Sequence, residues 1–257
     1  MSNDADQSAF GKELRPSSGY GTSGFNTTHW SAVLLAGQGD SLQAASALEQ
    51  LCRTYWYPLY AYARRQGHSP PDGQDLTQQF FAVFLQKNYF GLANPDRGRF
   101  RNFLLASFKH FLTNEYHRSR TTKRGGQCTF LSWDEAEAEE HYRGERRNEA
   151  SPDKLYEHAW ALTLLDKVMK DLQQECVRSG KIRLFQALQI FLTGEESEAT
   201  YEEIGRDLHM GESAIKMAVL RLRRRYGEML RNEIAHTVGD PTMVEDELHQ
   251  LMSALSR

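Results

Sequence analysis

The chain has 257 residues, of which 40% are hydrophobic and 25% charged, and its formal net charge is −3. This composition is typical of a folded globular chain rather than a disordered one, and no run of about 18 apolar residues that could cross a membrane occurs in it. The three cysteines, Cys52, Cys128 and Cys176, lie far apart, so they indicate neither a CxxC metal pair nor a disulfide framework. We interpret them as reduced thiols of a cytoplasmic protein, with Cys52 and Cys176 on buried helix faces.

The first half of the chain is predicted to be a helical domain over residues 27–120. Residues 1–26 are polar and rich in Ser and Gly, which indicates a mobile tail and not a secretory signal. A first helix is expected after Thr28, and a long one from Leu42 to Tyr62 that Pro58 kinks or splits. Residues 66–73 are predicted to be a turn. Two helices with phenylalanine stripes follow, one around Phe80 and one over residues 100–120.

The second half is predicted to be a smaller helical domain. Residues 121–152 are expected to form an acidic linker, followed by a domain over residues 153–235 with one helix from Leu155 to Leu172 and another through residues 184–192. Residues 236–257 form an extension whose helix is predicted to start with Asp240 as N-cap and Pro241 at the first helical position. Because no long stretch alternates with period two, we predict an all-α fold.

Charge is distributed unevenly along the chain. Residues 97–124 carry eight Lys and Arg against one acid, residues 134–157 carry nine acids against four bases, and residues 212–231 carry six bases against two acids. Two basic blocks that flank an acidic one indicate a polyanionic partner. The alternative is that these runs are solvated helix faces.

The strongest local motif is TYEEIGRDLHMGESAIKMAVLRLRRRYGEMLR, over residues 200–231. Thr200 and Glu203 have the spacing of a capping box, and residues 209–211 form a tight turn before a second, basic helix. Two helices joined by a short turn are typical of a helix-turn-helix. The outward face of the second helix carries Glu212, Ser213, Lys216, Met217, Leu220, Arg221 and Arg224.

This motif resembles region 4.2 of the extracytoplasmic-function sigma factors of bacterial RNA polymerase, in Tyr201, Glu203 and Ile204, then Ala214, Ile215 and Lys216, then the arginines from Arg221. The first half is similar to region 2 of the same family. Its segment Asp75-Leu76-Thr77-Gln78-Gln79-Phe80-Phe81 resembles region 2.2, and NPDRGRFRNFLLASFKHFLTNEYHRSRTTKR resembles regions 2.3 and 2.4. The two matches follow the family's order and cover about residues 42–124 and 155–232.

The resemblance implies an adaptor, without cofactor or metal, that binds core RNA polymerase and promoter DNA. It implies core docking by Asp75, Leu76, Gln78 and Gln79. It implies that the minus-ten element is read by Lys109, His110, Thr113, Asn114, His117, Arg118 and Arg120. It implies that the minus-thirty-five element is read by Glu212, Ser213, Lys216, Met217, Arg221 and Arg224. A separate anti-sigma or other regulatory protein is a further partner that the family admits, and no membrane partner is expected.

Three other functions are considered. An enzyme is disfavoured, because the sequence has no Gly-rich phosphate loop, nucleophile elbow or ligand cluster at metal spacing. A stand-alone helix-turn-helix regulator explains residues 200–231 but leaves the basic block at 97–124 without a role. A protein-interaction module that lost promoter activity stays open, because many family members have Asn at the position of His110 and Asp at that of Asn114.

Two segments outside the motifs also have alternative roles. The acidic residues from Asp134 to Glu157 can be a plain spacer, can thread a basic channel of the polymerase, or can fold onto the basic blocks and mask them. The C-terminal helix can dock on the second domain as a structural element or act as a regulatory tail.

Overall fold

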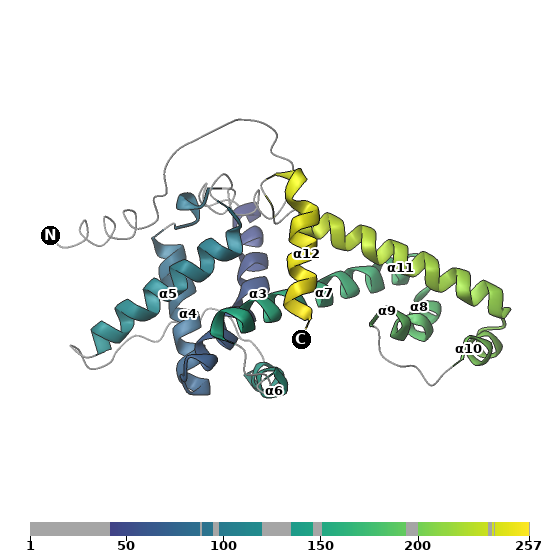
Figure 1. Ribbon diagram of the computed structural model, residues 1–257, viewed down its shortest axis with the longest axis horizontal. Helices are drawn as coiled ribbons and strands as arrows, with labels where there is room; N and C mark the ends of the chain where they lie inside the picture. Colours follow the sequence, from purple (N-terminus) through teal and green to yellow (C-terminus); the bar gives the residue numbers. More distant parts are fainter. Residues whose placement is uncertain are drawn as a thin grey trace.

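Every described element of the computed structural model in Figure 1 is a helix. The structure describes residues 42–87, 89–94, 98–119, 135–145, 151–193, 200–235, 238 and 240–256. The predicted N-terminal tail, the predicted helix after Thr28 and residues 121–134 of the predicted linker lie outside these ranges. Since the described residues contain no strand, the all-α prediction is confirmed.

Three helices and a 3-10 turn make up the first part of the described chain. These are α3 (Leu42–Arg65), α4 (Pro70–Gln86), the 3-10 helix η1 (Tyr89–Leu92) and α5 (Phe100–Ser119). Pro58 lies inside α3 without splitting it into two helices. The phenylalanine stripes are core, because Phe80, Phe84 and Phe108 are almost fully buried.

The predicted turn over residues 66–73 is wrong in its second half, because α4 already begins at Pro70. Ser69 is the N-cap, and its hydroxyl accepts a hydrogen bond from the backbone N–H of Asp72 at 3.3 Å. Pro70 and Pro71 occupy the first turn, where a helix has no intrahelical acceptor for backbone N–H groups, so the Pro-Pro pair starts this helix instead of excluding it.

The predicted acidic linker contains a helix, α6 (Glu135–Glu145), that the sequence analysis missed. Ala138 and Tyr142, one turn apart, are its buried residues. Glu139, on the same helix, forms an ion pair with Arg64 of α3 at 2.9 Å. The described part of this segment is therefore packed against the helical domain.

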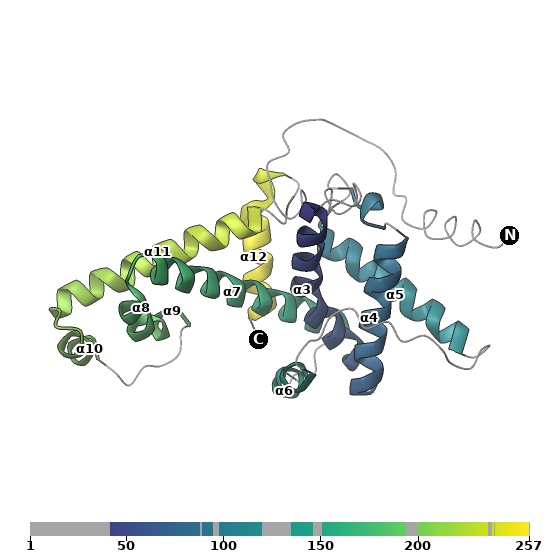
Figure 2. The same ribbon diagram turned by 180° about the vertical axis from the view of Figure 1, so that it is seen from behind.

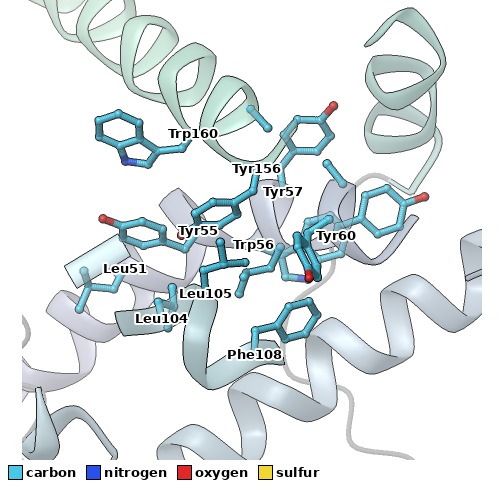
Figure 3. Close-up of a cluster of buried hydrophobic side chains, with 14 of the residues drawn as sticks. Leu51, Tyr55, Trp56, Tyr57, Tyr60, Leu104, Leu105, Phe108, Tyr156 and Trp160 are labelled. Carbon is cyan, nitrogen blue, oxygen red and sulfur yellow. The ribbon is translucent and has the colours of Figure 1, made fainter. Parts of the chain in front are cut away.

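Helix α7 (Pro152–Arg178) joins the two halves of the chain. Its first half packs against α3, where Tyr156 and Trp160 lie among the aromatic side chains of that helix (Figure 3). Its second half buries Leu172 and Cys176 against Phe185. One continuous cluster of buried residues thus draws members from both predicted domains, and the division into two domains stays a prediction.

The remaining helices surround the second half of α7. They are α8 (Ile182–Leu188), α9 (Ile190–Thr193), α10 (Tyr201–Asp207), α11 (Glu212–Ala235), the 3-10 helix η3 (Pro241–Met243) and α12 (Val244–Leu255). The single helix expected through residues 184–192 is in fact α8 and α9, divided at Gln189.

The predicted start of the C-terminal helix is also wrong. Residues 241–243 form a 3-10 turn, the carboxylate of Asp240 accepts a hydrogen bond from the backbone N–H of Thr242 at 2.9 Å, and α12 begins only at Val244. Asp240 therefore caps the 3-10 turn that precedes the helix.

The helices are distributed along one long axis of the molecule, and α3 and α12 run across it (Figures 1 and 2). Helices α4 and α5 occupy one end, α10 and the first turns of α11 occupy the other, and α12 lies between them (Figures 1 and 2). Helix α12 packs against both α7 and α11. Among the described helices, none combines the length and the apolar character that a membrane span requires.

Candidate nucleic-acid interface

Helices α10 and α11 form the predicted two-helix unit. The capping box is present: the Thr200 hydroxyl accepts a hydrogen bond from the Glu203 N–H at 3.2 Å, and the Glu203 carboxylate accepts one from the Thr200 N–H at 2.8 Å. The carbonyl of Gly211 accepts the first hydrogen bond of α11, from the N–H of Ile215 at 3.1 Å. Ile215 and Val219 are buried against Ile204 and Leu188, so the unit has its own small core.

The turn between these helices passes very close to α10 at Gly205. The backbone N–H of Met210 donates to the Gly205 carbonyl at 2.8 Å, and a Cβ atom at Gly205 would lie 2.6 Å from the Met210 carbonyl oxygen. His209 has a φ of 55°, the left-handed conformation that reverses the chain here. A glycine at position 205 is thus required by the close approach of the turn.

The face of α11 that the sequence predicts to read duplex DNA is exposed. All six predicted contact residues are exposed: Glu212, Ser213, Lys216, Met217, Arg221 and Arg224. Leu220, which lies on the same face, is 59% exposed. Lys216 forms an ion pair with Glu212 at 2.7 Å and lies 5.9 Å from the centre of the Tyr201 ring. Such an exposed pair contributes little free energy, so a DNA phosphate can replace Glu212 as the partner of Lys216.

Two other arginines of α11 bond to neighbouring helices. Arg223 donates from Nε and Nη2 to the carbonyl of Phe191 on α9, at 3.1 and 2.9 Å. Arg225 binds Glu175 of α7 at 2.7 Å. The hydrogen bond from Arg225 holds the pKa of the Glu175 carboxyl below its usual range. The arginine run therefore divides into Arg223 and Arg225, which bond to neighbouring helices, and Arg221 and Arg224, which are exposed on the predicted DNA-reading face.

A cavity of about 750 Å³ lies beside this face, between α7, α8 and α11. Its walls include Phe185, Leu184 and Cys176, and its α11 side includes Met217 and Arg221. Three of the predicted DNA-reading residues, Ser213, Met217 and Arg221, therefore also border an apolar hollow.

The predicted minus-ten face lies on α5. Thr113, Asn114 and His117 are exposed, while Lys109 and His110 are half-buried. Lys109 forms an ion pair with Asp153, in the first turn of α7, and lies 5.6 Å from the centre of the Tyr62 ring. The side chain of Arg118 and the whole of Arg120 lie outside the described residues. The structure thus places six of the seven predicted residues on one helix, five of them with described side chains.

The predicted polymerase-docking face is on α4. Asp75 is exposed, and Gln78 and Gln79 are half-buried. Leu76 is partly buried and packs against the main core, so it supports the helix more than it contributes to its outer surface. The i, i+3, i+4 spacing places Asp75, Gln78 and Gln79 on one face, as expected.

Tyr116 is a candidate contact that the sequence analysis missed. It is 62% exposed, and its ring makes an edge contact of 5.9 Å with that of His117. Exposed aromatic rings are platforms on which unstacked bases stack. Tyr116 follows core phenylalanines at helical spacing, so the sequence pattern did not single it out. Periodicity alone does not show which aromatic rings near the end of a helix are exposed.

The two buried cysteines do not form a reactive site. Cys52 and Cys176 are buried free thiols, as predicted, and burial raises the pKa of Cys52 to about 12. Within the described ranges, no three His, Cys, Asp or Glu side chains are grouped so that they could hold a metal ion.

Comparison of the chain with protein-family models, with curated proteins and with solved structures gives no match. The resemblance to sigma factors therefore rests on the sequence motifs quoted above.

Proposed function

We propose that the protein is a bacterial alternative sigma factor, which binds core RNA polymerase and selects promoters. The observation that carries the proposal is the α10–α11 unit, with its capping box, its glycine at the tight turn and its exposed basic face. The exposed polar face of α5, with Thr113, Asn114 and His117, also supports it, because a stand-alone duplex reader needs only the α10–α11 unit.

The two faces suit different forms of DNA. Helix α11 presents long cations and small polar groups near its N-terminus, which suits the major groove and flanking phosphates of a duplex. Helix α5 presents an amide, imidazoles and the exposed ring of Tyr116, which suits unstacked bases of a single strand. The two faces lie towards opposite ends of the molecule, which is compatible with two separate promoter elements.

The duplex-reading role is tested by Lys216→Ala and Arg221→Ala, with Lys170→Ala as the control because Lys170 is an exposed lysine on α7. Removing a cation that contacts a phosphate reduces the slope of log affinity against log salt by about 1. We expect that reduction in both variants when binding of the polymerase complex to promoter duplex is titrated with salt, and none in the control. Unchanged affinity and slope in both variants would refute the assignment of α11 as the recognition helix.

A stand-alone helix-turn-helix regulator is the second candidate, favoured by the fact that the α10–α11 unit has its own core. It predicts tight, sequence-specific duplex binding by the purified chain without polymerase. The sigma-factor proposal predicts weak duplex binding that polymerase strengthens. A gel-shift titration with and without core polymerase separates the two candidates.

A further inference from the structure

Helix α12 inserts a carboxylate between two arginines at the start of α5. The Glu247 side chain is fully buried, and its two oxygens contact Nε of Arg99 and Nη1 of Arg101. Gln250, one turn further along α12, accepts hydrogen bonds from both arginines through its side-chain oxygen. The contact therefore joins residues about 150 positions apart in the chain.

Arg101 is held from three sides. It is 3% exposed, its Nε donates to Glu157 of α7 at 2.9 Å, and its guanidinium lies over the Trp160 ring, 4.2 Å from the centre. Burial lowers the pKa of Arg101, an effect that Glu157 opposes. A cation in such surroundings depends on its acidic partners, since removing one partner of a buried pair leaves an uncompensated charge.

The same helix is attached to α11. Leu251 of α12 is fully buried in the cluster that contains Leu230 and Ile234 of α11. Glu245 and Arg231 form an exposed ion pair at 3.4 Å. Helix α12 thus contacts both helices that carry the predicted DNA-reading faces, and it lies beyond residue 232, where the family motif ends.

These contacts neutralise part of the first basic block. Of the eight cations in residues 97–124, Arg99, Arg101 and Lys109 are paired with acids from the second half of the chain. The attraction of a protein for DNA rises with the number of cations that can neutralise phosphates. Intramolecular pairing therefore lowers the field that α5 presents to DNA.

We propose that α12 is an autoinhibitory clamp, closed by Glu247, which lowers the affinity of the free chain for DNA. When α12 leaves, Arg99 becomes available to phosphates, Arg101 keeps only its partners on α7, and α5 is no longer tied to α11. The inference rests on the proposed function only in taking DNA as the ligand.

The test compares Glu247→Gln with Glu245→Gln in the full chain. Both substitutions remove one negative charge from α12, but Glu247 is fully buried whereas Glu245 is 67% exposed. Hydrogen exchange of the α12 amides reports whether the clamp is open. Binding to a random-sequence fluorescent duplex at low salt, without polymerase, reports the effect on DNA affinity.

We expect Glu247→Gln to speed exchange across α12 and the first turn of α5 by at least tenfold, and to raise duplex affinity roughly threefold or more. Glu245→Gln should change the exchange rate and the duplex affinity by less than twofold each. Unchanged exchange in Glu247→Gln would overturn the clamp, and faster exchange with unchanged or weaker DNA binding would overturn its inhibitory role. Neither readout needs polymerase, so the clamp is decided separately from the sigma-factor proposal.

If Glu247→Gln does not fold, Gln250→Ala replaces it. Gln250 is exposed, and its loss removes hydrogen bonds to both arginines without leaving a buried charge unpaired. We expect a smaller change of the same sign in both readouts. No change in either readout would then count against the clamp.

Discussion

At the scale of single residues, the tight turn of the helix-turn-helix depends on Gly205. Its missing Cβ leaves room for the Met210 carbonyl oxygen, which a methyl group would approach to 2.6 Å. Backbone cannot move away as easily as the end of a flexible side chain, so the unit must distort to admit even alanine.

We predict that Gly205→Ala lowers the free energy of unfolding by about 1–3 kcal/mol. Gly227→Ala is the matched control, because Gly227 is also helical and its Cβ would meet only Arg231 Nη1, at 3.8 Å. There the gain in helix propensity should stabilise by about 0.5–1 kcal/mol. Urea unfolding of both variants measures the two values, and equal effects would contradict the close approach at Gly205.

The proposed function gives two residues of α5 a role in strand opening. We predict that His110→Ala and Asn114→Ala weaken open-complex formation more than binding to closed duplex, because imidazole and amide groups suit unstacked base edges. Permanganate reactivity of the melted strand, compared with gel-shift affinity, measures both steps. Transcription from both variants equal to that of the unchanged protein would contradict this role.

At the scale of elements, one carboxylate of α6 bonds to two side chains of α3. The Glu139 oxygens accept hydrogen bonds from Arg64 Nη2 at 2.9 Å and from the Tyr60 hydroxyl at 2.7 Å. Burial alone would raise the pKa of Glu139, but the bonds from Arg64 and Tyr60 outweigh it and hold the pKa below its usual value of 4.5. Burial and the bond to Glu139 raise the pKa of Tyr60 to about 12.

This shift gives α6 a definite pH dependence. Because the folded-state pKa lies below the unfolded one, the stabilisation is fully present above the unfolded value and is lost as pH falls through the folded value. We predict that Glu139→Gln costs about 1–3 kcal/mol at neutral pH, and that its deficit relative to the unchanged protein shrinks as pH falls below 4.5.

Denaturant unfolding of both proteins from pH 7 to pH 3 measures this difference. Glu140→Gln is the control, because Glu140 is the exposed neighbour on the same helix, and it should leave stability nearly unchanged. A deficit that grows towards low pH would show that the sign of the shift is wrong.

The elements also show which features of the fold could be predicted from the sequence and which could not. The capping box at Thr200 and the stripe that buries Ile215 are local patterns, and both could be predicted. Helix α6 was missed because Ala138 and Tyr142 give too little periodicity in an acidic segment. The pairing of Glu247 with Arg99 could not be predicted, since a long-range contact depends on how α12 packs and leaves no local signal.

The candidate interface, too, could be predicted only in part. Spacing placed Lys216 and Arg221 on the exposed face of α11, as the structure has them. It did not distinguish Arg224, which pairs with Glu228 of its own helix, from Arg225, which binds Glu175 of α7. That distinction depends on which neighbouring helix lies against each side of α11, and only the tertiary structure supplies it.

At the scale of the whole molecule, helix α7 connects the two halves of the described chain. Its first half packs with α3 and its second half supports the helices around α10 and α11. The α4–α5 end and the α10–α11 end are therefore linked by one long helix, and α12 ties α5 to α11 across it. In the proposed function, this arrangement sets how far apart the two DNA-reading faces lie before polymerase binds.

Run-off transcription tests the central claim most directly. Core polymerase from the source organism would be incubated with a genomic DNA library, with and without the purified protein. We predict discrete new start sites that depend on the protein and share two upstream sequence elements. Absence of both initiation and core binding would contradict the account and leave the helix-turn-helix regulator as the better description.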